Sequence, residues 1–270
     1  MQAGIDPRHI PVVILAGGRG SRMADPHHPK PLVDLGNHAL ILHVIGHFYS
    51  YGFRDFICCA GHRSFELKDY FASLRLRYAT EATISLDGAR PYYAAGASRI
   101  PLDWHVTIVD TGPDIGTAGR ISGIRHLIDS SPFIITYCDG LSDIDLHALL
   151  AAHRAERRLA TISAVNASSA FGIVDGEAGL VTRFVEKPIT DGALINAGFI
   201  AADQDLFKAI DAVSESASLE GDVLSSLAAN GQLALFRHDG FWRPVDTPKD
   251  CEYVASLLKA GPRPWRFFEF

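Results

Sequence analysis

Short apolar runs that alternate with amphipathic segments set the tightest limit on how this chain can fold. The runs are rich in β-branched residues, which is typical of buried strands, whereas the segments between them repeat apolar residues at helical spacing. This alternation predicts an α/β fold, with a Rossmann-like, mostly parallel sheet flanked by helices. We expect strands at Val12–Leu15, Phe56–Cys59, Val106–Val109, Phe133–Ile135 and Thr161–Val165, and helices at Ala39–Tyr51, Phe65–Phe71, Gly119–Ile128 and Leu146–Ala155.

The pattern changes after about residue 163, where strand-like runs follow one another with turn residues between them. This change predicts a smaller mixed β/α subregion in the C-terminal half. The segment from Asp87 to Asp103 is rich in Gly, Ala, Pro and Tyr and is predicted to be a long loop, of the kind that forms lids or subunit arms. The later strands are expected at Phe171–Val174, Val181–Val185 and Ile195–Ile200, and the later helices at Leu206–Ala212, Val223–Ala229 and Cys251–Leu258.

Composition excludes several classes of protein. The 270 residues are 47% hydrophobic and 21% charged, which describes a globular chain that suits one α/β domain. The formal net charge of -6 argues against binding to nucleic acid, which needs a basic surface. No apolar stretch is long enough to span a bilayer, and Met1–Ile10 lacks the apolar core of a signal peptide. Since its four cysteines form no C-x-x-C pair, we expect buried free thiols and a cytoplasmic location.

A glycine-rich turn follows the first predicted strand directly. After Val12–Leu15 the chain reads Ala16-Gly17-Gly18-Arg19-Gly20-Ser21-Arg22, and three glycines in four positions let backbone N–H groups approach an anion closely. In an open α/β sheet this is the carboxyl end of a strand, where ligands bind. The turn is not a P-loop, because no Gly-Lys-Ser/Thr follows at the required spacing. It is predicted to hold phosphate, and a purely structural turn is the alternative.

Two cations and a carboxylate sharpen this prediction. Arg22 and Lys30 lie in the loop that follows the glycines, and prolines on both sides of Lys30 restrict its backbone. Asp139 comes just after the predicted strand Phe133–Ile135 and precedes Gly140, so it lies at the same edge of the sheet. A carboxylate there can hold Mg²⁺, a hard ion that is commonly shared with substrate phosphates. Taken singly, Lys30 also fits a surface lysine and Asp139 a turn residue.

The motifs taken together, and in this order, resemble the sugar-1-phosphate nucleotidyltransferase family over nearly the whole chain. The resemblance is closest to its glucose-1-phosphate cytidylyltransferase branch. The segments that carry it are Leu15–Arg22, Pro29–Leu32, Val109–Gly112, Thr117–Arg120, Tyr137–Gly140, Phe171–Gly172, Glu186–Pro188, Ile195–Phe199 and Gly240–Thr247.

This resemblance implies a role for each matching residue. It implies Mg²⁺ bound by Asp139 and Asp246, with Lys30 and Arg22 as catalytic cations. It implies a nucleotide-binding part at about 10–165 and a sugar-phosphate-binding part at about 166–270, within a single domain covering 1–270. The implied nucleotide-binding residues are Leu15, Ala16, Gly17, Gly18, Gly20, Ser21, Thr117, Arg120 and Cys138, and the implied sugar-phosphate-binding residues are Gly172, Glu186, Lys187 and Asn196.

The implied reaction joins a nucleoside triphosphate, with CTP favoured, to a sugar 1-phosphate, with glucose 1-phosphate favoured, and releases pyrophosphate. The resemblance also implies a homo-oligomer. Four positions depart from the branch and leave the substrates open, so that another triphosphate or a different sugar or cyclitol phosphate is the first alternative. A glycosyltransferase and an inactive, nucleotide-sugar-binding regulatory relative are the alternatives from other classes. The departures are His28, Ala118, Cys138 and Ala170.

Overall fold

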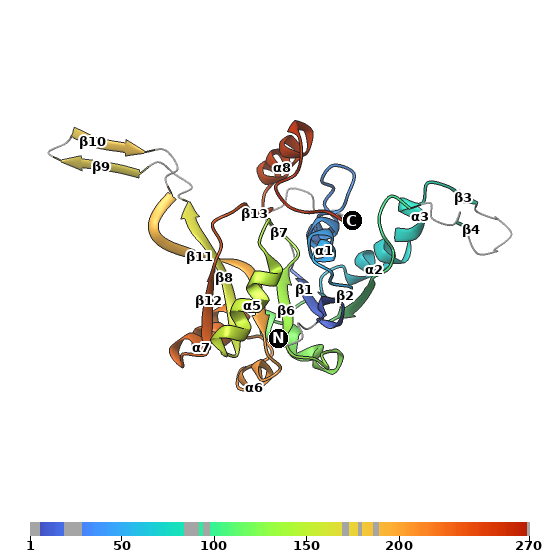
Figure 1. The fold of residues 1–270 in the computed structure, drawn as a ribbon, viewed down its shortest axis with the longest axis horizontal. Coiled ribbons are helices and arrows are strands. Elements are labelled where there is room, and N and C mark those ends of the chain that lie inside the picture. The colour runs from blue at the N-terminus through green and yellow to red at the C-terminus, as the bar shows by residue number, and fades with distance from the viewer. Residues whose placement is uncertain are drawn as a thin grey trace.

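The computed structural model describes residues 6–18, 29–83, 92–93, 98–168, 173–177, 180–185 and 189–268. The largest sheet in these ranges contains β1 (Val12–Ala16), β2 (Asp55–Ala60), β5 (His105–Asp110), β6 (Phe133–Tyr137), β8 (Ala160–Ser168), β11 (Ile189–Ala202) and β12 (Leu233–Arg237). Its strand order is β12-β8-β11-β6-β1-β2-β5 (Figure 1). Neighbouring strands are parallel except where β11 runs antiparallel to β6 and β8. The predicted fold class is therefore confirmed.

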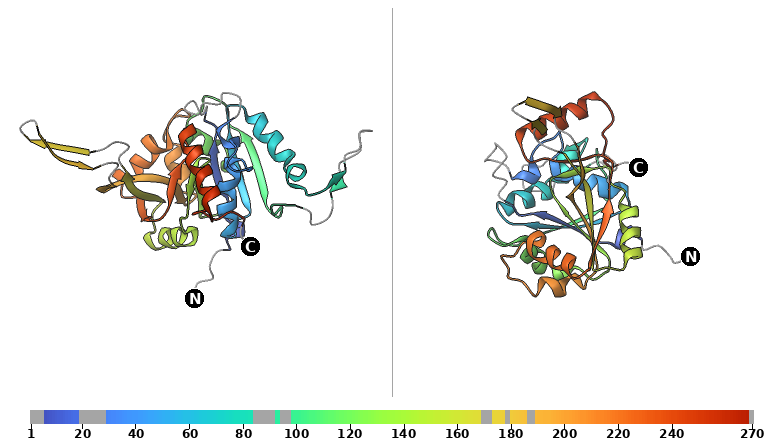
Figure 2. Two further views of the ribbon diagram at one scale, coloured as in Figure 1. Left: turned by 90° about the horizontal axis from the view of Figure 1, so that it is seen from above. Right: turned by 90° about the vertical axis from the view of Figure 1, so that its left-hand side faces the viewer.

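Three small antiparallel pairs accompany this sheet. They are β9 (Ile173–Glu177) with β10 (Leu180–Val185), β7 (Gly140–Ser142) with β13 (Trp242–Pro244), and β3 (Ala82–Thr83) with β4 (Tyr92–Tyr93). The β9–β10 and β3–β4 pairs extend away from the central sheet on opposite sides (Figures 1 and 2). The prediction of a loop throughout Asp87–Asp103 was wrong at Tyr92–Tyr93, where aromatic residues of high strand propensity pair with β3.

Helices cover both faces of the sheet (Figure 2). Apolar side chains of α1, α2 and α5 pack on one face, and those of α4, α6 and α7 pack on the other. The helices are α1 (Leu40–Ser50), α2 (Ser64–Ala72), α3 (Leu74–Tyr78), α4 (Thr117–Gly123), α5 (Leu146–Glu156), α6 (Leu206–Ile210), α7 (Ser225–Ala229) and α8 (Pro248–Ala260). Three 3₁₀ turns, η1 (Pro7–His9), η2 (Lys30–Leu32) and η3 (Arg125–Leu127), and one π-helical segment, η4 (Leu219–Leu224), complete the described elements.

The predicted helices differ from the observed ones by a few residues at their ends, and two of these differences have a local physical reason. The helix expected over Gly119–Ile128 is the shorter α4, which ends at Gly123 and is followed by η3. Glycine at the last position weakens the helix there because it gains no side-chain packing and loses the most backbone entropy. The helix expected from Val223 begins only at Ser225, because the residues before it form the π-helical η4.

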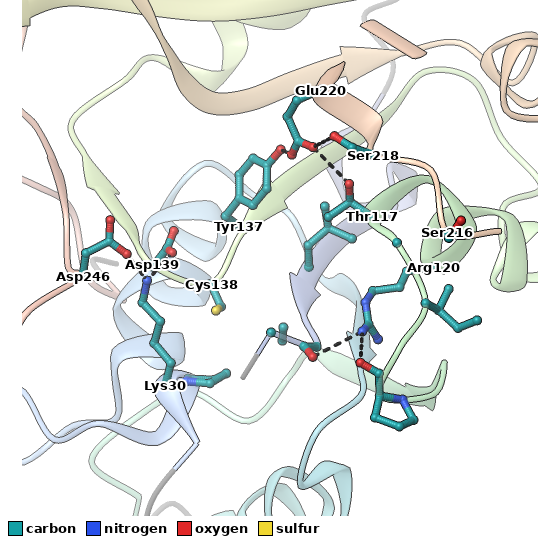
Figure 3. A pocket seen from close by; sticks show the side chains of 18 residues that line it. Lys30, Thr117, Arg120, Tyr137, Cys138, Asp139, Ser216, Ser218, Glu220 and Asp246 are labelled. Atoms are coloured by element: carbon teal, nitrogen blue, oxygen red, sulfur yellow. Dashed lines mark hydrogen bonds and ion pairs between the residues drawn. The ribbon is translucent and has the colours of Figure 1, made fainter. Parts of the chain in front are cut away.

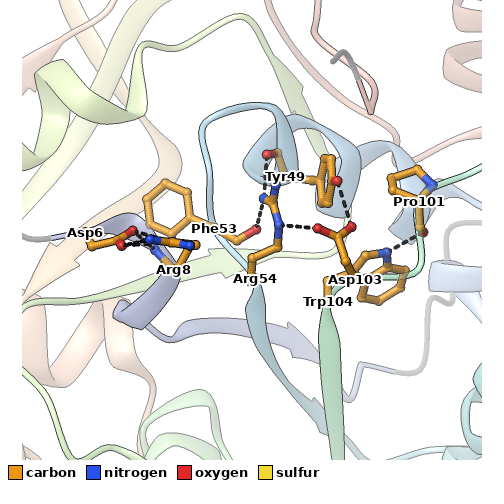
Figure 4. A network of polar contacts seen from close by, with 8 residues as sticks. All are labelled: Asp6, Arg8, Tyr49, Phe53, Arg54, Pro101, Asp103 and Trp104. Carbon is orange, nitrogen blue, oxygen red and sulfur yellow. Dashed lines mark hydrogen bonds and ion pairs between the residues drawn. The ribbon is translucent and has the colours of Figure 1, made fainter.

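A small polar network fixes the end of α1 against the strands beside it (Figure 4). The guanidinium of Arg54 lies 3.6 Å from the centre of the Tyr49 ring and donates to the carboxylate of Asp103 at 3.3 Å. The Tyr49 hydroxyl donates to the same carboxylate at 2.8 Å. Because Arg54 precedes β2 and Asp103 precedes β5, the network holds the amino ends of both strands in place.

The order of the strands reverses beside β1. From β1 the chain proceeds outward to β2 and β5, and then returns to β6 on the other side of β1. Leu15 pairs with Tyr137 in the β1–β6 ladder, so the carboxyl ends of these two strands lie next to each other. In open α/β sheets such a reversal opens a crevice in which ligands bind. The fold therefore places Gly17, Gly18 and Asp139 at the position where a ligand site is expected.

Other described features bear on the earlier predictions. No helix among the described residues is long and apolar enough to cross a membrane. The thiols of Cys58, Cys59 and Cys138 are buried as predicted, while Cys251 is partly exposed. Burial raises the pKa of the Cys58 thiol well above its ordinary value. These cysteines are therefore protonated, packed side chains at neutral pH.

Candidate active site

A cavity of about 580 Å³ lies at the crevice between β1 and β6 (Figure 3). The carboxyl ends of β1 and β6, the start of α4 and the residues next to η4 and α8 form its wall. The fold thus gathers ten of the residues predicted from the sequence around one space. They are Leu15, Ala16, Gly17, Gly18, Lys30, Thr117, Arg120, Cys138, Asp139 and Asp246.

The ammonium of Lys30 lies between two carboxylates in this cavity. Its Nζ is 2.5 Å from Asp139 Oδ2 and 2.5 Å from Asp246 Oδ1. The Lys30 side chain is only 12% exposed. Burial by itself lowers the pKa of Lys30, but the charges and hydrogen bonds of the two carboxylates outweigh burial and raise it. Lys30 is therefore a charged, mostly buried cation held in a fixed position.

Two prolines determine how the chain presents Lys30. Pro29 adopts an extended conformation with φ -65° and ψ 142°, and Pro31 occupies the first turn of η2, where its missing N–H costs no hydrogen bond. The amide of Val33 closes the turn onto the carbonyl of Lys30 at 3.2 Å. The Pro-Lys-Pro segment is thus a rigid turn beside the cavity, and it limits the backbone entropy lost in positioning the lysine.

The pairing of β7 with β13 brings the two carboxylates together. Pro244 pairs with Gly140 in this antiparallel ladder. Asp139 immediately precedes β7, and Asp246 follows β13 closely, so the antiparallel direction places them at the same end of the pair. The amide of Val245 donates to the carbonyl of Asp139 at 2.9 Å and continues the ladder to this point.

The backbone beside Asp246 is fixed by a capping box at the start of α8. The Thr247 hydroxyl accepts from the amide of Asp250, and the Asp250 carboxylate accepts from the amide of Thr247 at 2.9 Å. The same carboxylate accepts from the amide of Asp246 at 3.2 Å and from Arg243 at 2.7 Å. Sequence reasoning missed Asp250, although Thr-x-x-Asp before a helix is a recognisable capping signal. Its role is to position Asp246.

The donor set at this point fits a divalent cation. Two carboxylate oxygens already lie within 2.5 Å of one positive atom, so their geometry and charge suit a cation between them. No group of three or more His, Cys, Asp or Glu side chains occurs as a ready metal cage within the described parts of the chain. Mg²⁺ is usually held by one or two carboxylates together with substrate phosphates, so two carboxylates suffice for it.

Arg120 is buried next to Gly17 and lines the cavity. Its guanidinium donates to the Thr111 hydroxyl at 2.6 Å and to the carbonyls of Gly112 and Gly17 at 2.8 and 3.3 Å. Burial lowers the pKa of Arg120. A Cβ added to Gly17 would lie 2.2 Å from Arg120 Nη1, so a larger residue here would force the guanidinium away from these hydrogen bonds. Arg120 therefore holds Gly17 against the ends of β2 and β5.

Sequence reasoning missed Glu220, a carboxylate on the part of the cavity wall formed by α4, β6 and η4, where three hydroxyl groups surround it. The Glu220 carboxylate accepts from the Tyr137 hydroxyl, from Ser218 Oγ at 2.7 Å and from Thr117 Oγ1 at 3.0 Å. Burial raises the pKa of Glu220, but these hydrogen bonds outweigh burial and hold it below its ordinary value. No local sequence pattern marks Glu220, because its partners come from three separate elements.

A second, smaller cavity of about 140 Å³ adjoins the first and shares Tyr137, Asp139 and Asp246 with it. Asn196, predicted to bind sugar phosphate, lies on this cavity, and its side chain accepts from the amide of Gly198 at 2.7 Å. Gly198 has φ +83°, and a Cβ there would lie 2.7 Å from the Tyr137 ring. A bulge in β11 thus forms the floor under Tyr137 and opens this cavity beside the carboxylates.

Several predicted site residues lie outside the described residues, so the structure does not place them. They are Gly20, Ser21, Arg22, Gly172, Glu186 and Lys187, together with the departures His28 and Ala170.

The fold and this geometry suit one class of protein, an α/β enzyme with a cavity where a lysine, two carboxylates and the first glycines after β1 meet. The sequence profile of the nucleotidyl transferase family matches residues 11–259, and the chain belongs to this family. It is accordingly a nucleotidyltransferase.

Individual relatives agree with this assignment. The chain is 35% identical to a glucose-1-phosphate cytidylyltransferase of Salmonella typhi over 260 residues, covering 95% of this chain and 99% of the relative. It is 32% identical to a probable glucose-1-phosphate cytidylyltransferase of Bacillus subtilis over 256 residues, covering 94% and 98%. A crystal structure of a putative glucose-1-phosphate thymidylyltransferase from Bacillus anthracis has a TM-score of 0.65 at 15% identity, covering 94% and 97%, and shows the same fold.

Proposed function

We propose that this nucleotidyltransferase joins CTP to glucose 1-phosphate, forming a cytidine diphosphate sugar and pyrophosphate. One observation carries the proposal: the Lys30 ammonium is held between Asp139 and Asp246 in a cavity at the strand-order reversal. The two cytidylyltransferase relatives, matched over almost their whole length, support the choice of both substrates.

The chemistry is an in-line displacement. A phosphate oxygen of the sugar 1-phosphate attacks the α-phosphorus of the triphosphate, a new P–O bond forms, and the bond from the α-phosphorus to the bridging oxygen of pyrophosphate breaks. The attacking oxygen is already ionised at neutral pH, so no side chain has to remove a proton. The barrier is electrostatic, because two anions approach each other while charge moves to the leaving group. Positioning and fixed positive charge are therefore the main catalytic contributions.

Each described residue has a proposed role in this reaction. The backbone N–H groups of Gly17 and Gly18 bind the triphosphate, and Lys30 stabilises the α-phosphoryl group. Asn196 lines the neighbouring cavity, into which the sugar fits. By resemblance Arg22 holds the pyrophosphate end and Lys187 the sugar phosphate, with Gly20, Ser21, Gly172 and Glu186 beside them.

Members of this family generally use a divalent metal ion, and we propose Mg²⁺ for this chain. Asp139 and Asp246 are the residues that would hold it. When bound, the ion neutralises negative charge on phosphate oxygens.

Two of the four departures from the cytidylyltransferase pattern lie in described residues, and of these Cys138 borders the cavity whereas Ala118 does not. Cys138 borders the cavity and is 6% exposed, so its side chain takes up room where a glycine would leave space. Ala118, another of the four departures, is 0% exposed and packs into the core on the α4 side of the sheet. Cys138 is therefore the described departure that bears on substrate choice.

A pyrophosphate-release assay with CTP, UTP, ATP and GTP against a panel of sugar and cyclitol phosphates tests the proposal. CTP with glucose 1-phosphate should give the highest kcat/KM, and the Lys30→Ala variant provides the background. A higher kcat/KM with another pair would reassign the substrates. Release of free nucleoside diphosphate from a nucleotide-sugar would point to a glycosyltransferase instead, and binding without turnover to a regulatory relative.

Three broader assignments complete the proposal. We assign the nucleotide to the part at about 10–165 and the sugar phosphate to the part at about 166–270, with Asp246 shared at their boundary. We propose a homo-oligomer, which size-exclusion chromatography with light scattering would test. We also propose a cytoplasmic location, in keeping with three buried, unpaired thiols.

A further inference from the structure

The two ends of the main cavity differ in the polar groups that they offer a ligand. One end offers the backbone donors of Gly17 and Gly18 and the Lys30 ammonium, which lies between Asp139 and Asp246. The other end offers Glu220, Thr117 and Ser218, with Tyr137 between Glu220 and Asp139 (Figure 3). A triphosphate belongs at the end with the cation and the backbone donors. The base of the same nucleotide then extends toward the carboxylate of Glu220, which repels phosphate.

Three hydroxyl groups use their single protons on Glu220. The Thr117 hydroxyl donates to Glu220 and accepts from the amide of Leu219 at 2.7 Å. The Ser218 hydroxyl donates to Glu220 and accepts from the amide of Gly221 at 2.9 Å. Tyr137 also donates its proton to Glu220. Because a hydroxyl has one proton to give, the cluster presents only acceptor oxygens to the cavity.

The segment that carries Glu220 is held rigidly. Ser218 caps η4, and the amide of Ser218 donates to the carboxylate of Asp222 at 2.7 Å. The whole of η4 is π-helical, a rare conformation that frequently occurs at functional sites. A carboxylate half-buried in this way also loses hydration, a cost that a merely structural contact between η4 and α4 does not require.

We propose that Glu220 determines base specificity by accepting a hydrogen bond from the exocyclic amine of the nucleotide base. This inference rests on the proposed nucleotidyl transfer and deepens it. Cytosine presents an amino group where uracil and thymine present a carbonyl oxygen, and a carboxylate accepts from the former and repels the latter. Tyr137, Ser218 and Thr117 are positioning residues that hold the carboxylate ionised and oriented.

The test compares kcat/KM for CTP and UTP in wild type and Glu220→Gln. Glutamine keeps the shape but adds an N–H₂ donor that can pair with a carbonyl, so the CTP/UTP ratio should fall by at least tenfold. Asp222→Asn is the matched control, because Asp222 supports the same segment but does not border the cavity. This control should lower the melting temperature and leave the ratio unchanged.

The outcomes separate this inference from the proposed function. If kcat/KM falls equally for CTP and UTP in Glu220→Gln, the proposed role of Glu220 is wrong, while the CTP assignment stands. A wild type that prefers ATP or GTP would overturn the CTP assignment, while erosion of that preference in the variant would support Glu220. A wild-type preference for UTP or dTTP would overturn both.

If Glu220→Gln does not fold, Tyr137→Phe provides a second test. This variant removes one donor from the Glu220 carboxylate and should lower the CTP/UTP ratio of kcat/KM severalfold. An unchanged ratio in Tyr137→Phe would count against the role of Glu220.

Discussion

Replacing Lys30 by alanine should separate catalysis from stability and from metal binding. The substitution removes the one atom that bonds both Asp139 and Asp246 at 2.5 Å. Since both carboxylate oxygens lie that close to the same nitrogen, they are no more than about 5 Å apart. At an effective dielectric constant of about 20, two unit charges at this separation repel by roughly 3 kcal/mol.

The substitution should therefore lower stability, tighten Mg²⁺ binding and slow turnover. Without divalent cation, nothing replaces the ammonium that offsets this repulsion in the wild type, so the free energy of unfolding of Lys30→Ala should fall by up to about 3 kcal/mol at neutral pH. With Mg²⁺ much of this loss should return, and Mg²⁺ should bind more tightly than in wild type because no ammonium competes for the two carboxylates. Turnover at saturating Mg²⁺ should nevertheless fall by roughly 10²–10³-fold, as for the loss of one preorganised charged donor.

Thermal unfolding with and without MgCl₂, calorimetric Mg²⁺ titration and pyrophosphate release provide the three measurements. Lys208→Ala, at a lysine whose side chain is 79% exposed, is the control and should match wild type in all three. Weaker Mg²⁺ binding in Lys30→Ala would refute the competition between ammonium and metal. Wild-type turnover would remove Lys30 from the mechanism.

Three further predictions concern the same fold. Asp139→Asn should weaken Mg²⁺ binding in a calorimetric titration; an unchanged isotherm would refute its role as a ligand. Gly17→Ala should destabilise the protein by about 1–3 kcal/mol in urea unfolding, because its Cβ would lie 2.2 Å from a buried, hydrogen-bonded guanidinium nitrogen. Gly18→Ala should cost far less, because no atom of the described residues lies within 4 Å of its Cβ. Burial lowers the pKa of His43 and of His47 to about 4, so the unfolded chain binds more protons between pH 6.5 and pH 4 and stability falls as the pH falls. Unfolding free energies at pH 7 and pH 5 should differ by roughly 2 kcal/mol per buried histidine, and equal values would contradict this account.

Local features of the sequence determined much of this fold. The short, apolar, β-branched run at Val12–Leu15 favours a buried strand, and β1 forms there. The alternation of such runs with helical segments was enough to predict the parallel sheet, because parallel strands need a crossover between them. The prolines around Lys30 likewise restrict its backbone whatever else the chain does.

Features that depend on distant residues were decided by the tertiary structure. The antiparallel insertion of β11 between β6 and β8 follows from hydrogen bonds between separate segments, which no local periodicity encodes. The same holds for the acceptor cluster at Glu220, whose partner Thr117 lies 103 positions earlier in the chain.

The candidate site shows both contributions. Lys30 and Asp139 could be picked out as candidates from their local motifs, and Asp246 from the resemblance to the nucleotidyltransferase family. The sequence did not show that these residues converge, because Lys30 and Asp246 are 216 positions apart. They meet only because β7 pairs with β13 beside the end of β6. Sequence sets the chemistry that each segment can offer, and long-range strand pairing decides which of these groups act on the same ligand.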